Sequence, residues 1–191
     1  LVLAWSYTAP PKNFANRWLL GCIFMPFFVP QISFLLGMQI SLSRFGLDGS
    51  WLALIWVHMI FILPYTWLIV IPARQALDSR LDHVAATLGA SAWQRFRRIH
   101  LPLMAYPLGT ALFIGISVSV ALYLPTVFVG AGRINTITVE AVSLAAGGSR
   151  GPAGVAAMLQ IAIPVLSFIV IHSWLRFRFA GFAGMRSGGL Q

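Results

Sequence analysis

Four apolar stretches of this sequence are each long enough to cross the hydrocarbon core of a lipid bilayer: residues 18–42, 51–73, 103–128 and 154–174. A transmembrane helix needs about 20 mostly apolar residues. The 191-residue chain is 59% hydrophobic and only 9% charged, whereas about a quarter of the residues of an ordinary globular domain are charged. A water-soluble fold could not bury this much apolar surface, so we expect the bilayer to surround most of the chain.

These stretches predict an all-α fold, a polytopic transmembrane helix bundle of about four complete spans. Residues 1–7 have the composition of the end of a further, truncated span, and the first residue is Leu1 rather than methionine. We therefore expect residues 1–191 to form a single transmembrane domain that is part of a longer polypeptide. Pro26 and Pro30 predict a kink in the first complete span, because neighbouring helices can bond the carbonyls that a proline frees.

Small side chains recur every four residues in the third complete span, at Ala111, Gly115 and Ser119. Such a seam lets transmembrane helices approach closely, although small residues that merely fill space are an alternative. The polar, glycine-rich segment 130–152 follows this span. Within it, residues 134–146 predict a short helix that lies outside the main spans or dips into the bundle.

The basic residues are unevenly divided between the two sides of the predicted bundle. Ten of them fall on one side: Lys12, Arg17, Arg74, Arg80, Arg95, Arg97, Arg98, Arg176, Arg178 and Arg186. Arg44, Arg133 and Arg150 fall on the other. Because Lys and Arg are enriched in cytoplasmic loops, we expect residues 78–102 and the C-terminus in the cytoplasm and residues 130–152 outside. Since the basic residues do not line one face, the net charge of +9 predicts no nucleic acid partner.

Residues 78–102 are the one long polar break between the spans, and they predict two short helices joined at Gly89. The apolar or small residues of the first helix fall on one face: Leu81, Val84, Ala85 and Leu88. Gly89 can take the positive φ that ends a helix. The alternative interpretation of this loop is a basic amphipathic segment lying on the lipid surface.

Capping signals mark where both helices of this loop begin. Asp78 or Ser79 can cap the first helix, with Asp82 completing a Ser-x-x-Asp box. Ser91 and Gln94 form a second capping box directly after Gly89. The second helix is therefore expected to start in a new direction.

The spacing of this loop resembles the cytoplasmic coupling loop of ABC importer permeases, whose pattern is Glu-Ala-Ala, three residues, Gly, nine residues and Ile-x-Leu-Pro. The matching residues, with both spacings kept, are His83, Val84, Ala85, Gly89, Ile99, Leu101 and Pro102. The order of the spans and the segment 136–148 also resemble binding-protein-dependent permeases of the iron, thiamine, polyamine and sulfate kind. The resemblance covers essentially the whole chain.

Two positions depart from the family pattern. His83 stands where the glutamate is usual, and Val84 replaces the first alanine, although Asp82 keeps an acidic group adjacent. The resemblance implies that the residues coupling this chain to an ATPase are Asp82, His83, Val84, Ala85, Leu88, Gly89, Ile99, Leu101 and Pro102.

The function implied by the resemblance is the membrane-spanning permease component of an ATP-driven ABC importer, multi-pass in the bacterial inner membrane. The chain would be the C-terminal half of a fused permease or one truncated subunit. Expected partners are a cytoplasmic ABC ATPase dimer, a second permease half or subunit, and a periplasmic or extracellular substrate-binding protein. The alternative is a membrane scaffold or channel that is not coupled to ATP hydrolysis.

No catalytic or nucleotide site is expected in this chain. A phosphate-binding Walker loop needs a lysine followed by Ser or Thr, whereas the only lysine, Lys12, precedes Asn13. We therefore expect ATP and Mg²⁺ to be bound by the partner ATPase and no cofactor to be held here. The single cysteine, Cys22, lies in an apolar run, so neither a disulfide framework nor a metal cluster is expected.

His58 and Tyr123 are the candidates for the substrate pathway. An ionisable side chain within a span is a functional-site hypothesis, but a neutral His58 that shares a hydrogen bond with a neighbouring helix is the simpler alternative. Tyr123 also suits an interfacial aromatic belt. His100 and His172 lie near span ends, where the interface can wet them, and are interpreted as structural. Glu140 is interpreted as paired or solvated.

Overall fold

The computed structural model describes residues 14–179, and every regular element within this range is helical. The helices are α2 (Phe14–Phe28), α3 (Gln31–Arg44), α4 (Trp51–Gln75), α5 (Ser79–Thr87), α6 (Ala92–Arg95), the π-helical turn η1 (Phe96–His100), α7 (Leu101–Leu103), α8 (Ala105–Ala121), α9 (Tyr123–Gly130), α10 (Ile137–Ala146) and α11 (Arg150–Phe179). An all-α membrane bundle is thereby confirmed. The expected truncated span, Lys12 and Arg186 lie outside the described residues.

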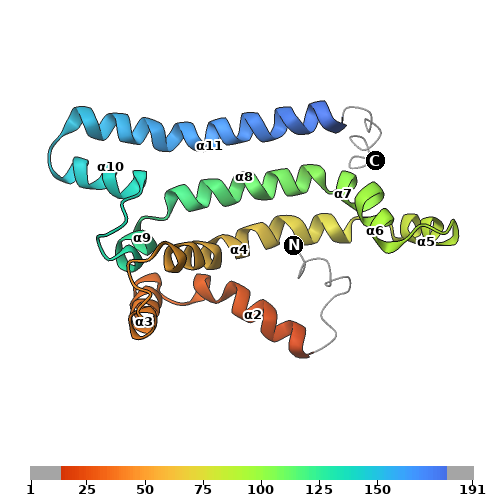
Figure 1. Ribbon diagram of the computed structural model, residues 1–191, viewed down its shortest axis with the longest axis horizontal. Helices are drawn as coiled ribbons and strands as arrows, with labels where there is room; N and C mark the ends of the chain where they lie inside the picture. The colour runs from red at the N-terminus through yellow and green to blue at the C-terminus, as the bar shows by residue number, and fades with distance from the viewer. Residues whose placement is uncertain (1–13, 180–191) are drawn as a thin grey trace.

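Three long helices lie side by side along the molecule, with α8 between α4 and α11 (Figure 1). The short helices α5, α6 and α7 lie together at one end of these rods, whereas α3, α9 and α10 lie at the other. The chain therefore folds as an antiparallel bundle whose two ends carry different connecting structures.

Two helices are long and apolar enough to cross a bilayer unaided: Trp51–Gln75 and Arg150–Phe179. Two further helix pairs qualify only as bent pairs, Leu20–Phe28 with Gln31–Arg44 and Ala92–Leu103 with Ala105–Ala121. The second and fourth expected spans are thus each one continuous helix.

The first expected span, residues 18–42, is broken rather than kinked. Its two helices meet at an angle of 115°. The break lies at Pro30, whose backbone is extended with ψ at 121°, and proline disfavours a helical conformation in the residue before it. Pro26 is accommodated inside α2, so only one of the two prolines interrupts the helix.

The third expected span, residues 103–128, is also shorter than predicted. It ends at Ala121, and Leu122 leaves the helical region with ψ at 87° before α9 begins. Pro125 accounts for this break, because it has no N–H to donate to the carbonyl of Ala121 and its ring crowds that carbonyl. The hydroxyl of Thr138 in α10 donates a hydrogen bond to the carbonyl of Val120 at the C-terminal end of α8.

The small-residue seam of α8 does allow close helix contact. A Cβ atom added at Gly115 would lie 3.2 Å from Cγ2 of Ile62 in α4. Outside the seam, one added at Gly109 would overlap Leu175 in α11. Ser119 continues the seam and bonds His58 of α4. The expected short helix between residues 134 and 146 is present as α10, which begins at Ile137.

Two apolar clusters hold α4 to its neighbours. Toward its C-terminal end, Trp67, Val70 and Ile71 pack with side chains of α2 and α8. Toward its N-terminal end, its residues pack with Leu35 of α3 and Val129 of α9. By contrast, α11 leaves most of its apolar side chains exposed, as expected of a helix whose outer face meets lipid.

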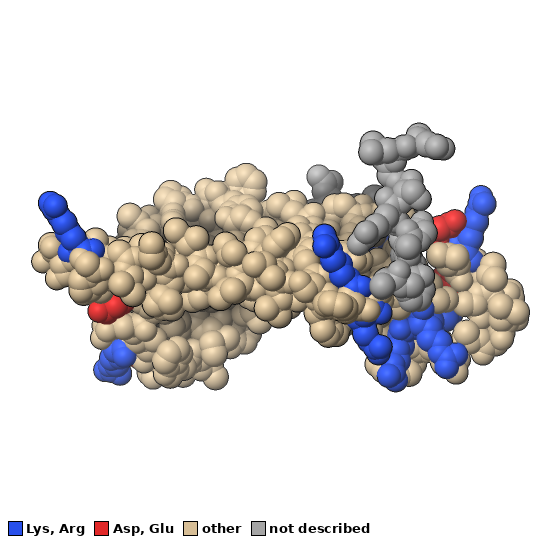
Figure 2. Space-filling view, turned by 90° about the horizontal axis from the view of Figure 1, so that it is seen from above, with Lys and Arg blue, Asp and Glu red and all other residues tan. Residues whose placement is uncertain are grey.

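Charged side chains gather at the two ends of the bundle and leave the surface between them uncharged (Figure 2). The end carrying α5 and α6 also holds Arg74 in the last turn of α4 and Arg176 and Arg178 in the last turn of α11. The uncharged band matches the hydrocarbon core of a bilayer. The arginine-rich end is the one formed by residues 78–102.

Candidate functional site

The candidate site is the arm formed by residues 78–102, built from α5, α6, η1 and α7. Asp78 caps α5 by accepting a hydrogen bond of 2.9 Å from the backbone N–H of Arg80. The expected capping box of Ser79 and Asp82 is wrong, because the Asp82 carboxylate bonds side chains of the second half of the arm instead. Because Asp78 is the N-cap of α5, Asp82 also lies one position beyond the residue that completes a capping box.

The first helix of the arm exposes its apolar face. Leu88 is 81% exposed, Val84 is 59% exposed and Leu81 is 47% exposed, whereas Ala85 is half-buried. These residues share one face as the sequence predicts. A short helix that presents large apolar side chains to solvent is a suitable surface for helix-in-groove binding.

The turn after α5 adopts the conformation that the sequence predicts. Gly89 has a φ of 79°, and Ser91 and Gln94 form a reciprocal capping box that starts α6. The chain then widens into the π-helical turn η1 before Leu101 and Pro102 begin α7. Turns of this rare kind are often found at functional sites.

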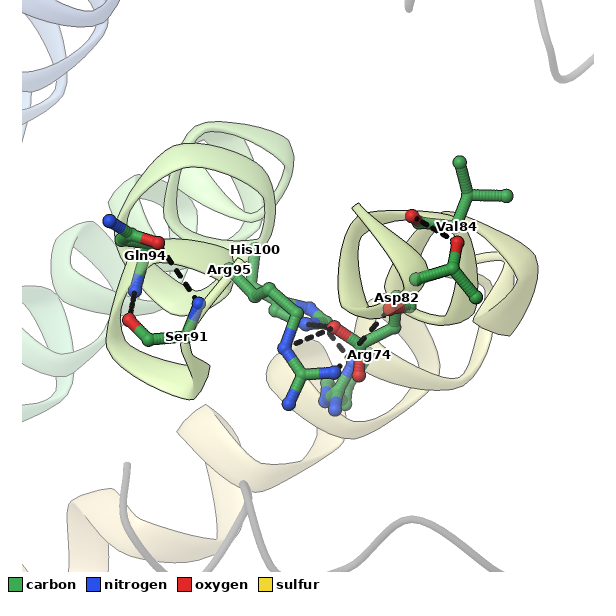
Figure 3. A network of polar contacts seen from close by, with 8 residues as sticks. Arg74, Asp82, Val84, Ser91, Gln94, Arg95 and His100 are labelled. Atoms are coloured by element: carbon green, nitrogen blue, oxygen red, sulfur yellow. Dashed lines mark hydrogen bonds and ion pairs between the residues drawn. The ribbon is translucent and has the colours of Figure 1, made fainter. Parts of the chain in front are cut away.

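Asp82 lies on the side of α5 that faces the rest of the arm, whereas Val84 projects from the opposite side of the helix (Figure 3). The Oδ1 atom of Asp82 is 3.0 Å from Nε2 of His100 and 3.8 Å from Nε of Arg95. Nη1 of Arg95 also donates to the backbone carbonyl of Asp82 at 3.4 Å. The expected role of Asp82 in ATPase contact stays a prediction, but this carboxylate is already engaged within the chain.

His100 is buried, with 6% of its surface exposed, so the expectation of a wetted histidine is wrong. Its Nδ1 atom lies 3.3 Å from Nη1 of Arg74 in the last turn of α4. Because a guanidinium only donates, Nδ1 must accept this bond. The other ring nitrogen, Nε2, then carries the proton and donates to Asp82. One neutral imidazole therefore joins Arg74 to Asp82.

The hydrogen bond with His100 lowers the pKa of the Asp82 carboxyl from its ordinary value of 3.8. Partial desolvation opposes this shift of the pKa, and the positive charges of Arg95 and Arg74 add to it. The carboxylate is therefore held in its charged form.

The remaining residues predicted to couple this chain to an ATPase are either exposed or half-buried. His83 is exposed, as is Leu101, whereas Ile99 and Pro102 are half-buried along the second half of the arm. A Cβ atom added at Gly89 would meet no atom within 4 Å, and His83 is exposed on the same arm. The structure thus leaves His83 free to face a partner in the position where the family pattern has glutamate.

A second polar group lies inside the bundle. Nδ1 of His58 is 3.0 Å from the hydroxyl of Ser119, and Nε2 is 3.2 Å from the hydroxyl of Thr126. His58 is thus hydrogen-bonded to neighbouring helices, as the simpler interpretation predicts. Tyr123, the other pathway candidate, is half-buried at the start of α9.

Sequence reasoning missed the polar connections that depend on distant partners. Arg74 and Arg95 were counted only as topological charges, and Thr126 was not singled out. His100 stands 18 residues after Asp82, and the Gly89 turn separates them, so local periodicity does not predict their contact. The one available signal was Pro125, which predicts that the helix breaks close to Thr126.

Residues 1–180 match the family described as binding-protein-dependent transport system inner membrane component. Over 168 residues, the chain is 36% identical to the inner membrane ABC transporter permease protein YnjC of Escherichia coli (strain K12), covering 88% of this chain and 32% of that protein. It is also 26% identical over 153 residues to the putative 2-aminoethylphosphonate transport system permease protein PhnV of Salmonella paratyphi A (strain ATCC 9150 / SARB42). That alignment covers 79% of this chain and 58% of PhnV. The chain thus spans about a third of one relative and less than two thirds of the other, and no solved structure matches it.

Proposed function

The chain belongs to the family of binding-protein-dependent transport system inner membrane components, and from this membership we propose that it is the permease part of an ATP-driven ABC importer. In this role it forms one side of the substrate pathway through the bacterial inner membrane. It also connects that pathway to ATPase subunits in the cytoplasm. The chain itself catalyses no reaction.

The observation that carries this proposal is the exposed apolar face of α5, formed by Leu81, Val84 and Leu88. Leaving this face in water is unfavourable, and a groove on a partner would bury it. The face lies on a helix that the Asp82–His100 hydrogen bond ties to the rest of the arm. A coupling element needs both features, because it must bind its partner and also pass on the displacement of that partner.

The distribution of charge supports a cytoplasmic position for this arm. Arginines of α4, α5, α6, η1 and α11 lie at the same end of the bundle (Figure 2). The positive-inside rule favours that end for the cytoplasm. The opposite end, with α10, would then face the substrate-binding protein.

We assign ATP binding, completion of the pathway and delivery of the substrate to partner proteins. A cytoplasmic ABC ATPase dimer would bind ATP and Mg²⁺, a second permease half or subunit would complete the pathway, and a substrate-binding protein would deliver the substrate. Closure of the ATPase dimer would move α5, and the attached helices would switch the pathway between its inward and outward openings.

The test is reconstitution of the full-length protein with its ATPase and its binding protein in proteoliposomes. Leu88→Asp places a charge on the exposed face, where burial of a leucine side chain is worth about 1.5–3 kcal/mol. We expect ATPase binding to weaken roughly 10- to 150-fold and uptake to fall with it. Leu88→Met keeps an apolar side chain of similar volume and should preserve both activities.

The alternative function, a membrane scaffold or channel, predicts different outcomes. In that case no stoichiometric ATPase would copurify with the protein, and uptake by the wild-type complex would not depend on ATP. Normal ATPase binding by Leu88→Asp would also contradict α5 as the docking element.

A further inference from the structure

The docking helix α5 is joined to two membrane helices through a side-chain bridge whose central residue, His100, is buried. Asp82 of α5 bonds His100 at 3.0 Å, and His100 is 3.3 Å from Arg74. Arg74 lies in the last turn of α4, and His100 directly precedes α7, which leads into α8. The three side chains therefore connect α5 with the ends of both α4 and α8.

The chemistry of this bridge fixes the orientation of each member. Arg74 donates to Nδ1 of His100, and Nε2 of His100 donates to the Asp82 carboxylate, as the donor-only guanidinium requires. His100 is 6% exposed, so water competes little for its two ring nitrogens. Arg95 contacts the same carboxylate from α6. An exchange of partners would leave a ring nitrogen of the buried His100 unsatisfied, so the bridge is stiff at this residue.

The backbone alone offers a weaker connection. Residues 76–78 link α4 to α5, and the Gly89 turn links α5 to α6. Both are short turns, in which a few dihedral angles can absorb a displacement. A side-chain bridge that spans α5, η1 and α4 resists such bending, so movement of α5 is passed to the spans.

We propose that Asp82, His100 and Arg74 are positioning residues that transmit the movement of the docking helix to α4 and α8. This inference rests on the proposed function and adds residues outside the docking face to the coupling machinery. The hydrogen bonds of the bridge lie within this chain. It determines how much uptake each ATP turnover produces.

The experiment compares uptake per ATP hydrolysed in the reconstituted full-length complex. His100→Leu removes both bonds of the bridge, and we expect it to lower this ratio about tenfold, with ATPase copurification unchanged. His100→Gln should restore most of the ratio, because its amide can donate to Asp82 and accept from Arg74. His172→Leu is the matched control and should keep the wild-type ratio, since His172 bonds only the Phe168 carbonyl of its own helix among described residues.

Asp82→Asn provides a second variant that keeps the shape of the side chain, for use if His100→Leu does not assemble. It should lower the ratio in the same direction, because it replaces the charged acceptor of the His100 hydrogen bond with a neutral amide. A wild-type ratio in an assembled His100→Leu or Asp82→Asn complex overturns the bridge. A wild-type complex without ATP-dependent uptake overturns the proposed function instead, so the two failures are distinguishable.

Discussion

At the scale of single residues, two neighbouring side chains of the arm, Asp82 and His83, have different surroundings. His83 is exposed on α5, whereas Asp82 faces His100 and Arg95. The family pattern has an acidic residue at position 83, and sequence alone suggests that Asp82 supplies it. In the structure this carboxylate instead stabilises the arm. Any contact between position 83 and an ATPase must therefore use an imidazole.

The lowered pKa of Asp82 predicts how the arm responds to acid. Its carboxyl has a pKa below the ordinary 3.8 in the folded chain, so the unfolded arm binds the proton more readily. The stabilisation is present above about pH 3.8 and is lost as the pH falls through the lower, folded pKa. Hydrogen exchange should show the protection of α5 amides decreasing in this window. Asp82→Asn should show low protection at every pH, and an unchanged pH profile in this variant would contradict the assignment.

Gly89 predicts a second residue-level effect. Its φ of 79° is unfavourable for a residue with a Cβ, yet a Cβ there would meet no atom within 4 Å. Gly89→Ala should therefore cost about 1–2 kcal/mol through the backbone alone, and Gly89→Asn should cost less because asparagine tolerates this region. Hydrogen exchange of residues 86–91 measures the difference. Equal protection in the two variants would show that the turn relaxes to another conformation.

At the scale of helices, His58 connects the two sides of a helix break. Ser119 lies in the last turn of α8 and Thr126 in the first turn of α9, and one imidazole bonds both across Leu122. The break itself follows from Pro125. His58 therefore fixes the angle between two helices that the backbone leaves free to vary.

His58→Leu should lower the stability of the purified protein. Hydrogen bonds between membrane helices average about 0.6 kcal/mol and reach about 1.7 kcal/mol, so loss of both predicts a decrease of roughly 1–3 kcal/mol in the free energy of unfolding. Denaturant titration in detergent measures this difference. His172→Leu is the control, because His172 is half-buried and its hydrogen bond is to the Phe168 carbonyl of its own helix. A loss of equal size in the control would contradict a specific role for His58.

At the scale of the whole molecule, the arginine-rich arm and α10 lie at opposite ends of an uncharged band (Figures 1 and 2). This arrangement predicts that the two ends face different sides of the membrane. Ala92 of α6 and Ala145 of α10 are both exposed, so cysteines at these positions form a matched pair.

Labelling of these cysteines in a Cys22→Ser background tests the topology. A membrane-impermeant thiol reagent should label Ala145→Cys in intact cells and label Ala92→Cys only after the membrane is opened. The native Cys22 must be replaced because it is exposed. Labelling of both positions in intact cells would overturn the assignment of the arm to the cytoplasm.

Local signals in the sequence were sufficient for much of the fold and for part of the candidate site. The apolar lengths predict α4 and α11, and the period of Leu81, Val84 and Leu88 predicts the exposed face of α5. The Ser91 and Gln94 capping box and the turn at Gly89 depend on residues within one helical turn. Such features need no distant partner, so their physical cause is contained in the segment that shows them.

The sequence by itself determined that this chain is a helical membrane protein with a helix–glycine–helix arm between two spans. Only the tertiary structure decided which prolines interrupt their helices: Pro30 lies at a break and Pro125 lies in the first turn after one, whereas Pro26 and Pro64 lie within continuous helices. It also decided that His100 is buried between Arg74 and Asp82. Both outcomes depend on what neighbouring helices supply, because freed carbonyls and buried polar groups are stable only where distant residues bond them.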